Sequence, residues 1–158
     1  MKSLRLLIAI ATTFMISFTA MSRDRIFSNY PDNNGISTVY ISGAAIRLGL
    51  SMAGSDSDMN QIQKFVRNPE GIEIVSAETP EAIKIVKKDF TGIANKLNME
   101  LMLNATDDGE VVNIYTSGVS EDNVIHDILI ETTEPDEYTL VYIRGEIDVN
   151  ALQEQYNK

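Results

Sequence analysis

The stretch TTEPDEYTLVYIRGEID, from Thr132 to Asp148, places a turn between two segments of strand-like residues. Glu134-Pro135-Asp136-Glu137 has the composition of a tight turn, because proline fixes φ and aspartate bonds its own backbone. Strands are therefore predicted on both sides of it, at 124–131 and at 138–145. Asp148 is expected to cap a short helix over 149–156. The many carboxylates are then mostly turn and surface groups, with Glu131, Glu134 and Glu137 expected on the solvent side.

A second hairpin is predicted just before this one. Asp107-Asp108-Gly109 forms a turn in which glycine is free to take a positive φ. It joins predicted strands at 99–105 and 110–116, and a loop at 118–123 leads to the next strand. Short connections keep consecutive strands adjacent, so these four strands are predicted to form an antiparallel meander.

The clearest helix start in the chain is Thr79-Pro80-Glu81. Thr79 is a helix cap, Pro80 lies at the first helical position, and Glu81 favours the positive end of the helix dipole. Apolar residues then recur at steps of three and four, as expected for a buried stripe; they are Ile83, Val86, Phe90, Ile93 and Leu97. Lys84, Lys87 and Lys88 fall mainly off the stripe and are interpreted as a solvated face, with a basic patch for a partner as the alternative.

Upstream of this helix, the sequence predicts two strands separated by helices. The strands are expected at 36–41 and 72–76, with a turn at 68–71 before the second. Ser42 is expected to cap a helix with Ala45, Ile46, Gly49 and Leu50 on one face, and a short helix is predicted at 59–66. Because helices connect the two strands, parallel or mixed pairing is expected between them.

These elements predict the α+β class, with a mixed sheet that ends in a four-strand antiparallel meander. Helices are expected mainly on one face of the sheet, and the other face is expected to be more polar. Residues 36–158 are interpreted as a single domain, and 23–35 as a flexible leader.

The N-terminus has the three parts of a secretory signal peptide over residues 1–22. Lys2 and Arg5 precede an apolar run, and Ala20-Met21-Ser22 places small residues at the cleavage site. The run is about fifteen residues, shorter than the roughly twenty of a spanning helix. Cleavage after Ser22 is predicted, which leaves a soluble protein in the periplasm or secreted. No cysteine follows the run, so no lipid anchor is expected.

The composition is acidic and contains no cysteine, with a formal net charge of −10. Removal of the signal leaves 11 basic and 23 acidic groups, a formal charge of −12. Such a chain is repelled by nucleic acid and by anionic membranes. Without cysteine it has no disulfides, thiol nucleophiles, thiolate zinc sites or iron–sulfur clusters.

The remaining site signals are weak. DSDMN, from Asp56 to Asn60, opens like a calcium loop, but Gln61 and Arg67 occupy the positions that need glycine and glutamate. His126 is the only histidine and is interpreted as a strand side chain, since a lone histidine without cysteine builds no usual zinc site. Four tyrosines lie in predicted strands and are interpreted as packing residues, with a ligand platform as the alternative; they are Tyr40, Tyr115, Tyr138 and Tyr142.

Two classes of function stay open. The leading one is a non-enzymatic binding or interaction module whose partner is an envelope protein or a small ligand. The alternative is a carboxylate-dependent, hydrolase-like enzyme that uses Asp107, Asp108 or Glu110. No catalytic residue, cofactor or metal ligand is assigned.

Four segments carry a resemblance to a known family. In chain order they are VYIS (39–42), GIEIVS (71–76), DDGEVVNIY (107–115) and EPDEYTLVYIRGEID (134–148). Together they resemble an exported Bacteroidetes family catalogued as domain of unknown function 4252, over about the whole mature chain. The resemblance implies a bacterial envelope protein. It implies no catalytic residues, because the family has no established activity.

Overall fold

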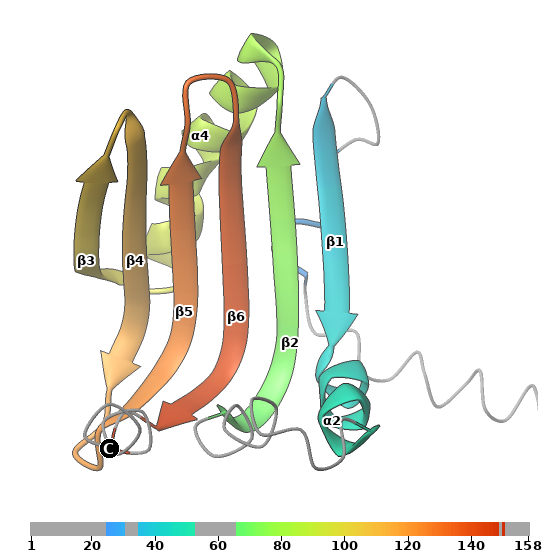
Figure 1. Cartoon of the computed structure of the whole chain (residues 1–158), viewed down its shortest axis with the longest axis vertical. Helices are drawn as coiled ribbons and strands as arrows, with labels where there is room; N and C mark the ends of the chain where they lie inside the picture. Colours follow the sequence, from blue (N-terminus) through green and yellow to red (C-terminus); the bar gives the residue numbers. More distant parts are fainter. Residues whose placement is uncertain (1–24, 31–34, 53–65, 149, 151–158) are drawn as a thin grey trace, which may run out of the picture.

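The computed structural model describes residues 25–30, 35–52, 66–148 and 150, in which six strands form one antiparallel sheet (Figure 1). The strand order is β1–β2–β6–β5–β4–β3. The strands are β1 (Ile36–Ser42), β2 (Val66–Ala77), β3 (Glu100–Asp107), β4 (Glu110–Val119), β5 (Val124–Thr133) and β6 (Tyr138–Asp148). The helices are α2 (Gly43–Met52) and α4 (Pro80–Lys96).

The predicted meander is confirmed, since β3, β4, β5 and β6 pair in sequence with their neighbours. The β3–β4 turn needs left-handed backbone at Asp108 (φ 42°) and Gly109 (φ 91°), which aspartate and glycine tolerate better than other residues. The β5–β6 turn is closed by the Glu134 N–H, which donates to the Glu137 carbonyl at 2.9 Å. Local turn chemistry therefore sets the order of this half of the sheet.

The predicted mixed sheet is wrong, because β1 pairs antiparallel with β2 and β2 pairs antiparallel with β6. Helix α2 continues from the end of β1 at one corner of the sheet and does not cross its face, so the next strand runs back alongside β1 (Figure 1). Helix α4 does cross a face. It joins β2 to the far edge strand β3, and these two strands run parallel without pairing.

Strand β2 is longer than predicted and contains the segment expected to be a turn. Its register shifts between Arg67 and Gly71, where Asn68 has a φ of 45°. Of the short helix predicted at 59–66, Val66 belongs to β2 and the rest lies outside the described residues. The signal segment also lies outside them, as does the C-terminal helix apart from Asn150, whose N–H donates to Asp148 Oδ1 at 3.0 Å.

The cap and stripe of α4 are confirmed. Thr79 Oγ1 accepts a hydrogen bond from the Ala82 N–H at 3.3 Å, and Pro80 is the first helical residue. Ala82 and Val86 are buried, and the stripe continues with partly buried side chains that pack against the core; these are Ile83, Phe90, Ile93 and Leu97. The amphipathic helix therefore covers one face of the sheet.

The core lies between that face and two covering segments, α4 and residues 25–30. Its buried residues are Phe27, Ile36, Val75, Ala77, Ala82, Val86, Leu129, Tyr138, Leu140 and Tyr142. Phe27 belongs to residues 23–35, which the sequence analysis interpreted as a flexible leader. Phe27 itself is only 2% exposed, so this part of the segment packs into the core. The large aromatic and aliphatic side chains of this layer supply most of the burial that stabilises the fold.

Candidate functional site

The face of the sheet opposite α4 is uncovered in the described part of the chain (Figure 1). We call it the open face and define it by three rows of side chains that run across the strands in register. The middle row is Val39, Ile74, Val141, Ile130, Ile114 and Leu103. The second row is Ile41, Ile72, Ile143, Ile128, Thr116 and Glu100. The third row is Ser37, Ser76, Thr139, Thr132, Val112 and Ala105.

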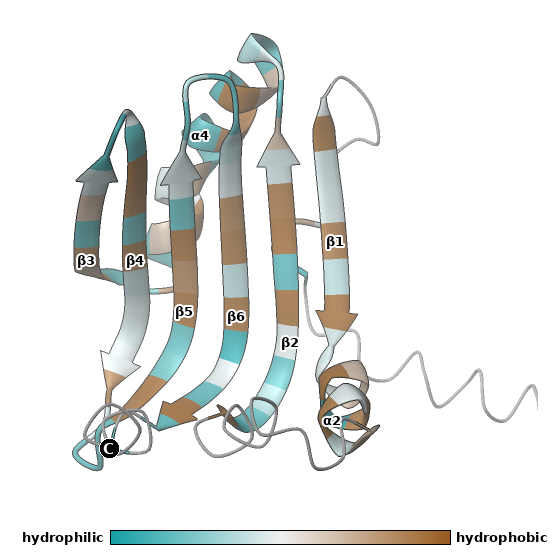
Figure 2. Cartoon of the chain, viewed as in Figure 1, coloured by the Kyte–Doolittle hydropathy of each residue, from teal (hydrophilic) through white to brown (hydrophobic). Residues whose placement is uncertain are grey.

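The expectation of a more polar second face is therefore wrong. The middle row takes one aliphatic residue from each of the six strands, and Glu100, at the β3 edge of the second row, is the only charged residue in the three rows. At the two ends of that row, Val39 is 50% exposed and Leu103 is 44% exposed. Figure 2 shows the hydrophobic bands that cross neighbouring strands at this level.

A signal for this face was present in the sequence. Leu140-Val141-Tyr142-Ile143 and Ile128-Leu129-Ile130 are continuous apolar runs without the alternation of a strand that has one solvated face. Residues of such a run point to both sides of the sheet. The runs therefore predict apolar side chains on both faces, and only one face carries a helix.

The open face is large for a surface of this kind. Strands about 4.8 Å apart and rows about 6.7 Å apart give six strands and three rows an area on the order of 600 Å², of which the two mainly aliphatic rows make up about 400 Å². Contiguous exposed apolar patches on soluble proteins seldom exceed a few hundred Å², and larger ones mark interaction sites. The open face is accordingly the strongest candidate for a functional surface in the described residues.

The covered face contains a carboxylate that tyrosines surround. Glu131 accepts hydrogen bonds from the Tyr138 hydroxyl at 2.7 Å, the Tyr115 hydroxyl at 3.1 Å and Asn113 Nδ2 at 2.9 Å. The prediction that Glu131 lies on the solvent side is wrong. Burial and then the charge of Glu131 raise the pKa of Tyr115 to about 12. Three donors occupy this carboxylate, so its role is to satisfy buried hydroxyls.

Burial, with Glu131 as the second cause, also raises the pKa of Tyr138. Tyr30 and Tyr142 likewise have raised pKa values, because they are buried and because Asp89 and Asp127, respectively, place negative charge beside them. These four tyrosines are therefore held neutral, and the hydroxyls of Tyr115, Tyr138 and Tyr142 donate hydrogen bonds to carboxylates. Tyr115, Tyr138 and Tyr142 belong to the core or pack against it, as the interpretation as packing residues requires.

A buried ion pair lies on the covered face beside residues 25–30. Glu73 is 2% exposed, and its Oε2 accepts the Phe27 N–H at 3.2 Å. Arg144 Nη2 lies 3.6 Å from Glu73 Oε1. The positive charge of Arg144 offsets the negative charge of Glu73 inside the protein. The hydrogen bond from the Phe27 N–H to Glu73 also fixes the backbone of residues 25–30. Glu73 thus attaches that segment to the sheet.

Next to the ion pair, β5 and β6 share an irregularity. The register shifts between His126 and Ile128, where Asp127 has a φ of 44°. Its carboxylate accepts the Gly145 N–H at 3.0 Å and the Tyr142 hydroxyl at 3.2 Å. The aspartate closes a β-bulge, which leaves its side chain in a structural role.

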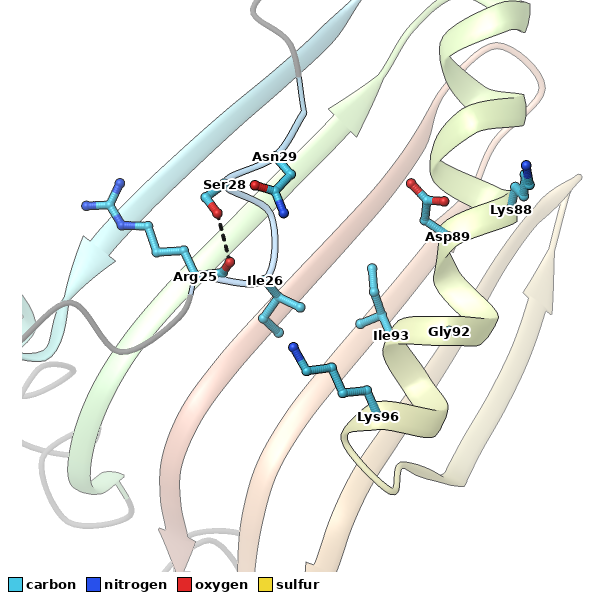
Figure 3. Close-up of a pocket in the computed structure, with 9 residues that line it drawn as sticks. All are labelled: Arg25, Ile26, Ser28, Asn29, Lys88, Asp89, Gly92, Ile93 and Lys96. Atoms are coloured by element: carbon cyan, nitrogen blue, oxygen red, sulfur yellow. Dashed lines mark hydrogen bonds between the residues drawn. The ribbon is translucent and has the colours of Figure 1, made fainter.

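A pocket of about 690 Å³ lies between residues 25–30 and α4 (Figure 3). It is lined by Arg25, Ile26, Ser28, Asn29, Lys88, Asp89, Gly92, Ile93 and Lys96. Arg25 extends away from the pocket, and its guanidinium lies 3.9 Å from the centre of the Tyr40 ring. Lys88 also points outward, whereas Lys96 reaches toward Ile26. The cationic groups do not converge, so the pocket lacks the geometry of an anion site.

The carboxylates considered for catalysis lie at one end of the sheet. Asp107, Asp108 and Glu110 are exposed at the β3–β4 turn, and the β5–β6 turn lies at the same end (Figure 1). Glu137 accepts hydrogen bonds from Ser76 Oγ at 2.7 Å and Thr139 Oγ1 at 3.0 Å. The described residues contain no group of three or more His, Asp or Glu side chains that could hold a metal ion.

The other candidates are also accounted for. His126 lies in β5, and its Nδ1 is 4.0 Å from Glu146 Oε1 at a partly exposed position. Lys84, Lys87 and Lys88 are exposed on α4, with Lys87 Nζ 5.0 Å from the centre of the Tyr138 ring. The segment 56–61 lies outside the described residues, and Arg67 forms an ion pair with Asp148.

The family model described as a domain of unknown function (DUF4252) matches residues 30–155, and the chain belongs to that family. The match spans β1 to β6 and therefore all three rows of the open face. No curated protein and no solved structure matches the chain. Among the described residues, no helix is long and apolar enough to cross a membrane.

Proposed function

We propose that this protein is an exported, non-enzymatic interaction module of the cell envelope, either periplasmic or secreted, that binds its partner with the open face. The observation that carries the proposal is the middle row, which presents one aliphatic side chain from every strand and no charge. Burial of such a surface is favoured at about 25 cal/mol per Å² of apolar area. The signal-peptide pattern at 1–22 supports export without a lasting membrane anchor.

The shape and charge of the open face favour a protein as its partner. Small-molecule sites are concave, with a few polar groups that orient the ligand. The open face is instead one side of a sheet, a surface that another sheet or helix covers in most folds. Nucleic acid is disfavoured because the phosphate backbone needs cationic contacts, and the rows contain no Lys or Arg.

The alternative, a carboxylate-dependent hydrolase-like enzyme, has weaker support. A general acid or base works within hydrogen-bond reach of the substrate, in a pocket that positions both. Asp107, Asp108 and Glu110 project from a turn and are exposed. The pocket beside α4 is lined by none of them.

Photo-crosslinking in cells that export the protein tests the proposal. A photoreactive phenylalanine analogue is placed at Val39 or at Leu103, the exposed ends of the middle row. The matched control is Ile85, an aliphatic residue of α4 that is 48% exposed away from the open face. The expected result is a discrete protein adduct from Val39 and Leu103 and none from Ile85. Absence of adducts at both open-face positions would contradict the proposed function.

A further inference from the structure

We propose that the partner is a second copy of this chain, and that two copies pack their open faces together into a two-layer β-sandwich. This inference rests on the proposed function, in which the open face is the binding surface. It adds the identity of the partner, the symmetry of the complex and the residues that meet in it.

The area of the open face is sufficient for a dimer. Its extent on the order of 600 Å² per copy would remove about 1,200 Å² in total from water, the lower bound for specific, stable protein interfaces. All six strands contribute to the middle row, so the contact would extend over the full width of the sheet. Area alone does not set the affinity of such an interface, which also depends on packing and electrostatic complementarity.

The side chains suit sheet-on-sheet packing. The middle row contains only Val, Ile and Leu, and the second row is Ile apart from Thr116 and Glu100. Face-to-face sheets lie about 10 Å apart, with aliphatic side chains that interdigitate between them. β-Branched side chains are stiff at χ1 and lose little rotamer freedom when such a layer closes. The surface is also self-complementary, as an isologous two-fold interface requires.

Charge permits this partner in spite of the acidic composition. Two copies that each carry a formal charge of −12 after signal removal repel one another at most surfaces. The open face is an exception, because its one charged side chain, Glu100, lies at the β3 edge of the sheet and the other residues of the three rows are neutral. The third row, of Ser and Thr with Val112 and Ala105, places neutral hydroxyls at its margin.

Two directions of the two-fold axis bring the middle rows of the two copies together. Both ends of the sheet are acidic, with the β3–β4 and β5–β6 turns at one end and Glu121, Asp122 and Glu146 at the other, so the charge of the ends favours neither direction. An axis parallel to the strands superposes the second rows of the two copies. An axis across the strands, close to the middle row, places the second row of each copy over the third row of the other. Each residue of the middle row then lies near its own equivalent.

Sedimentation equilibrium of the mature chain, residues 23–158, tests this inference between about 1 and 100 µM, concentrations at which a dimer with a dissociation constant of the same order is partly dissociated. The wild type is expected to sediment as a monomer–dimer equilibrium. The disruptive variant combines Ile74→Thr, Val141→Thr and Ile130→Thr, which keeps β-branching and strand propensity but removes apolar surface. It should raise the dimer dissociation constant at least about 100-fold. Ile85→Thr is the matched control and should leave the constant unchanged.

A second variant keeps the test decisive if the triple variant fails to fold. Val39→Lys changes one half-exposed residue at the end of the row, where the lysine head stays in water in the monomer. In the dimer it would place two like charges close together, so the dimer should weaken while the circular dichroism spectrum stays native. An unchanged dimer in Val39→Lys and in the folded triple variant would place the interface elsewhere and overturn the inference.

The remaining outcome separates this inference from the proposed function. A wild type that stays monomeric at 100 µM, with an adduct to a different protein in cells at Val39 and Leu103, would overturn the dimer and support the interaction module. A monomer with no adduct would overturn both. A dimer that the open-face variants dissociate, and that Ile85→Thr leaves intact, supports the inference.

Discussion

Leu129 and Ile130 are neighbours in β5, yet Leu129 is fully buried beneath α4 and Ile130 stands on the open face, in the middle row. The two faces of the sheet are built from alternate residues of the same strands, and both have an aliphatic component. They differ in polar content. The covered face includes tyrosines, Glu131 and the Glu73–Arg144 pair, whereas the rows of the open face contain aliphatic side chains and neutral hydroxyls, with Glu100 at the β3 edge as their one charged residue.

This difference separates two roles for buried surface. On the covered face, each polar group needs its partner at one position, so the hydrogen bonds to Glu131 and Glu73 favour a single register of helix, sheet and N-terminal segment. The open face has no such directional requirement. Removal of its apolar side chains from water lowers the free energy against any surface of suitable shape, which is the property expected of a docking surface.

The largest contrast between the faces should appear at alkaline pH. Tyr30, Tyr115, Tyr138 and Tyr142 have raised pKa values in the folded protein, so the unfolded chain loses these protons first. Their stabilisation is complete below the ordinary tyrosine pKa of 10.0 and is lost as pH rises through the folded values, the lowest of which is about 12. Stability should therefore fall steeply above pH 10.

Tyrosinate absorbance near 295 nm and far-ultraviolet circular dichroism, recorded together, measure this effect. We expect most of the absorbance change to coincide with unfolding. A gradual absorbance change centred near pH 10 with a native spectrum would show that the tyrosines of the covered face are accessible, and would remove the contrast.

The next contrast compares adjacent residues. Leu129→Ala should lower the free energy of unfolding by about 2–5 kcal/mol, because a fully buried leucine leaves a cavity. Ile130→Ala should cost the monomer less than about 1.5 kcal/mol, since its side chain is already partly hydrated. Urea melts at low protein concentration, where the monomer dominates, give both values. Equal losses would show that the open face is covered in the monomer.

A smaller effect is expected from one hydroxyl of the covered face. Tyr138→Phe removes the 2.7 Å hydrogen bond to Glu131 and should cost about 1.5–3 kcal/mol, the usual range for a bond to a charged group. Tyr40→Phe is the control, because the Tyr40 hydroxyl makes no hydrogen bond within the described part of the chain. In thermal melts, Tyr138→Phe should therefore be less stable than Tyr40→Phe. If Tyr138→Phe leaves the stability of the protein unchanged, water replaces the tyrosine hydroxyl as a hydrogen-bond donor to Glu131.

The smallest effect concerns Glu137, at the margin of the open face. Hydrogen bonds from Ser76 and then Thr139 lower the pKa of its carboxyl below the ordinary 4.5. The resulting stabilisation is present above pH 4.5 and is lost as pH falls through the lowered folded value. Glu137→Gln should therefore narrow the stability difference between pH 5 and pH 3 slightly. If the stability of Glu137→Gln depends on pH in the same way as that of the wild type, the Glu137 carboxylate makes no hydrogen bond that stabilises the folded protein.

Features that depend on a few neighbouring residues were predictable from the sequence. The Thr79 cap with Pro80, the turn at Asp108-Gly109 and the turn around Pro135 each have a local chemical cause, and each is present. These signals were sufficient for the α4 helix and for the four-strand meander.

Features that depend on long-range pairing were not predictable in the same way. The antiparallel pairing of β1 with β2 follows from the position of α2 at a corner of the sheet, and no local signal marks that position. Glu131 was assigned to solvent because the rule for alternating residues does not show that Tyr138 and Tyr115 lie on either side of it across the strands. The open face was missed although the run from Leu140 to Ile143 indicated apolar side chains on both faces.

Methyl NMR on isoleucine-labelled protein tests the central claim most directly, since Ile74, Ile130 and Ile143 lie on the open face and Ile83 and Ile93 lie in α4. On dilution from about 100 to about 1 µM, which dissociates a dimer with a dissociation constant of that order, the methyl shifts of the first group should change together, and those of the second group should stay fixed. Invariant shifts at the open face, or changes confined to α4, would contradict the claim that this face is the surface at which the protein associates.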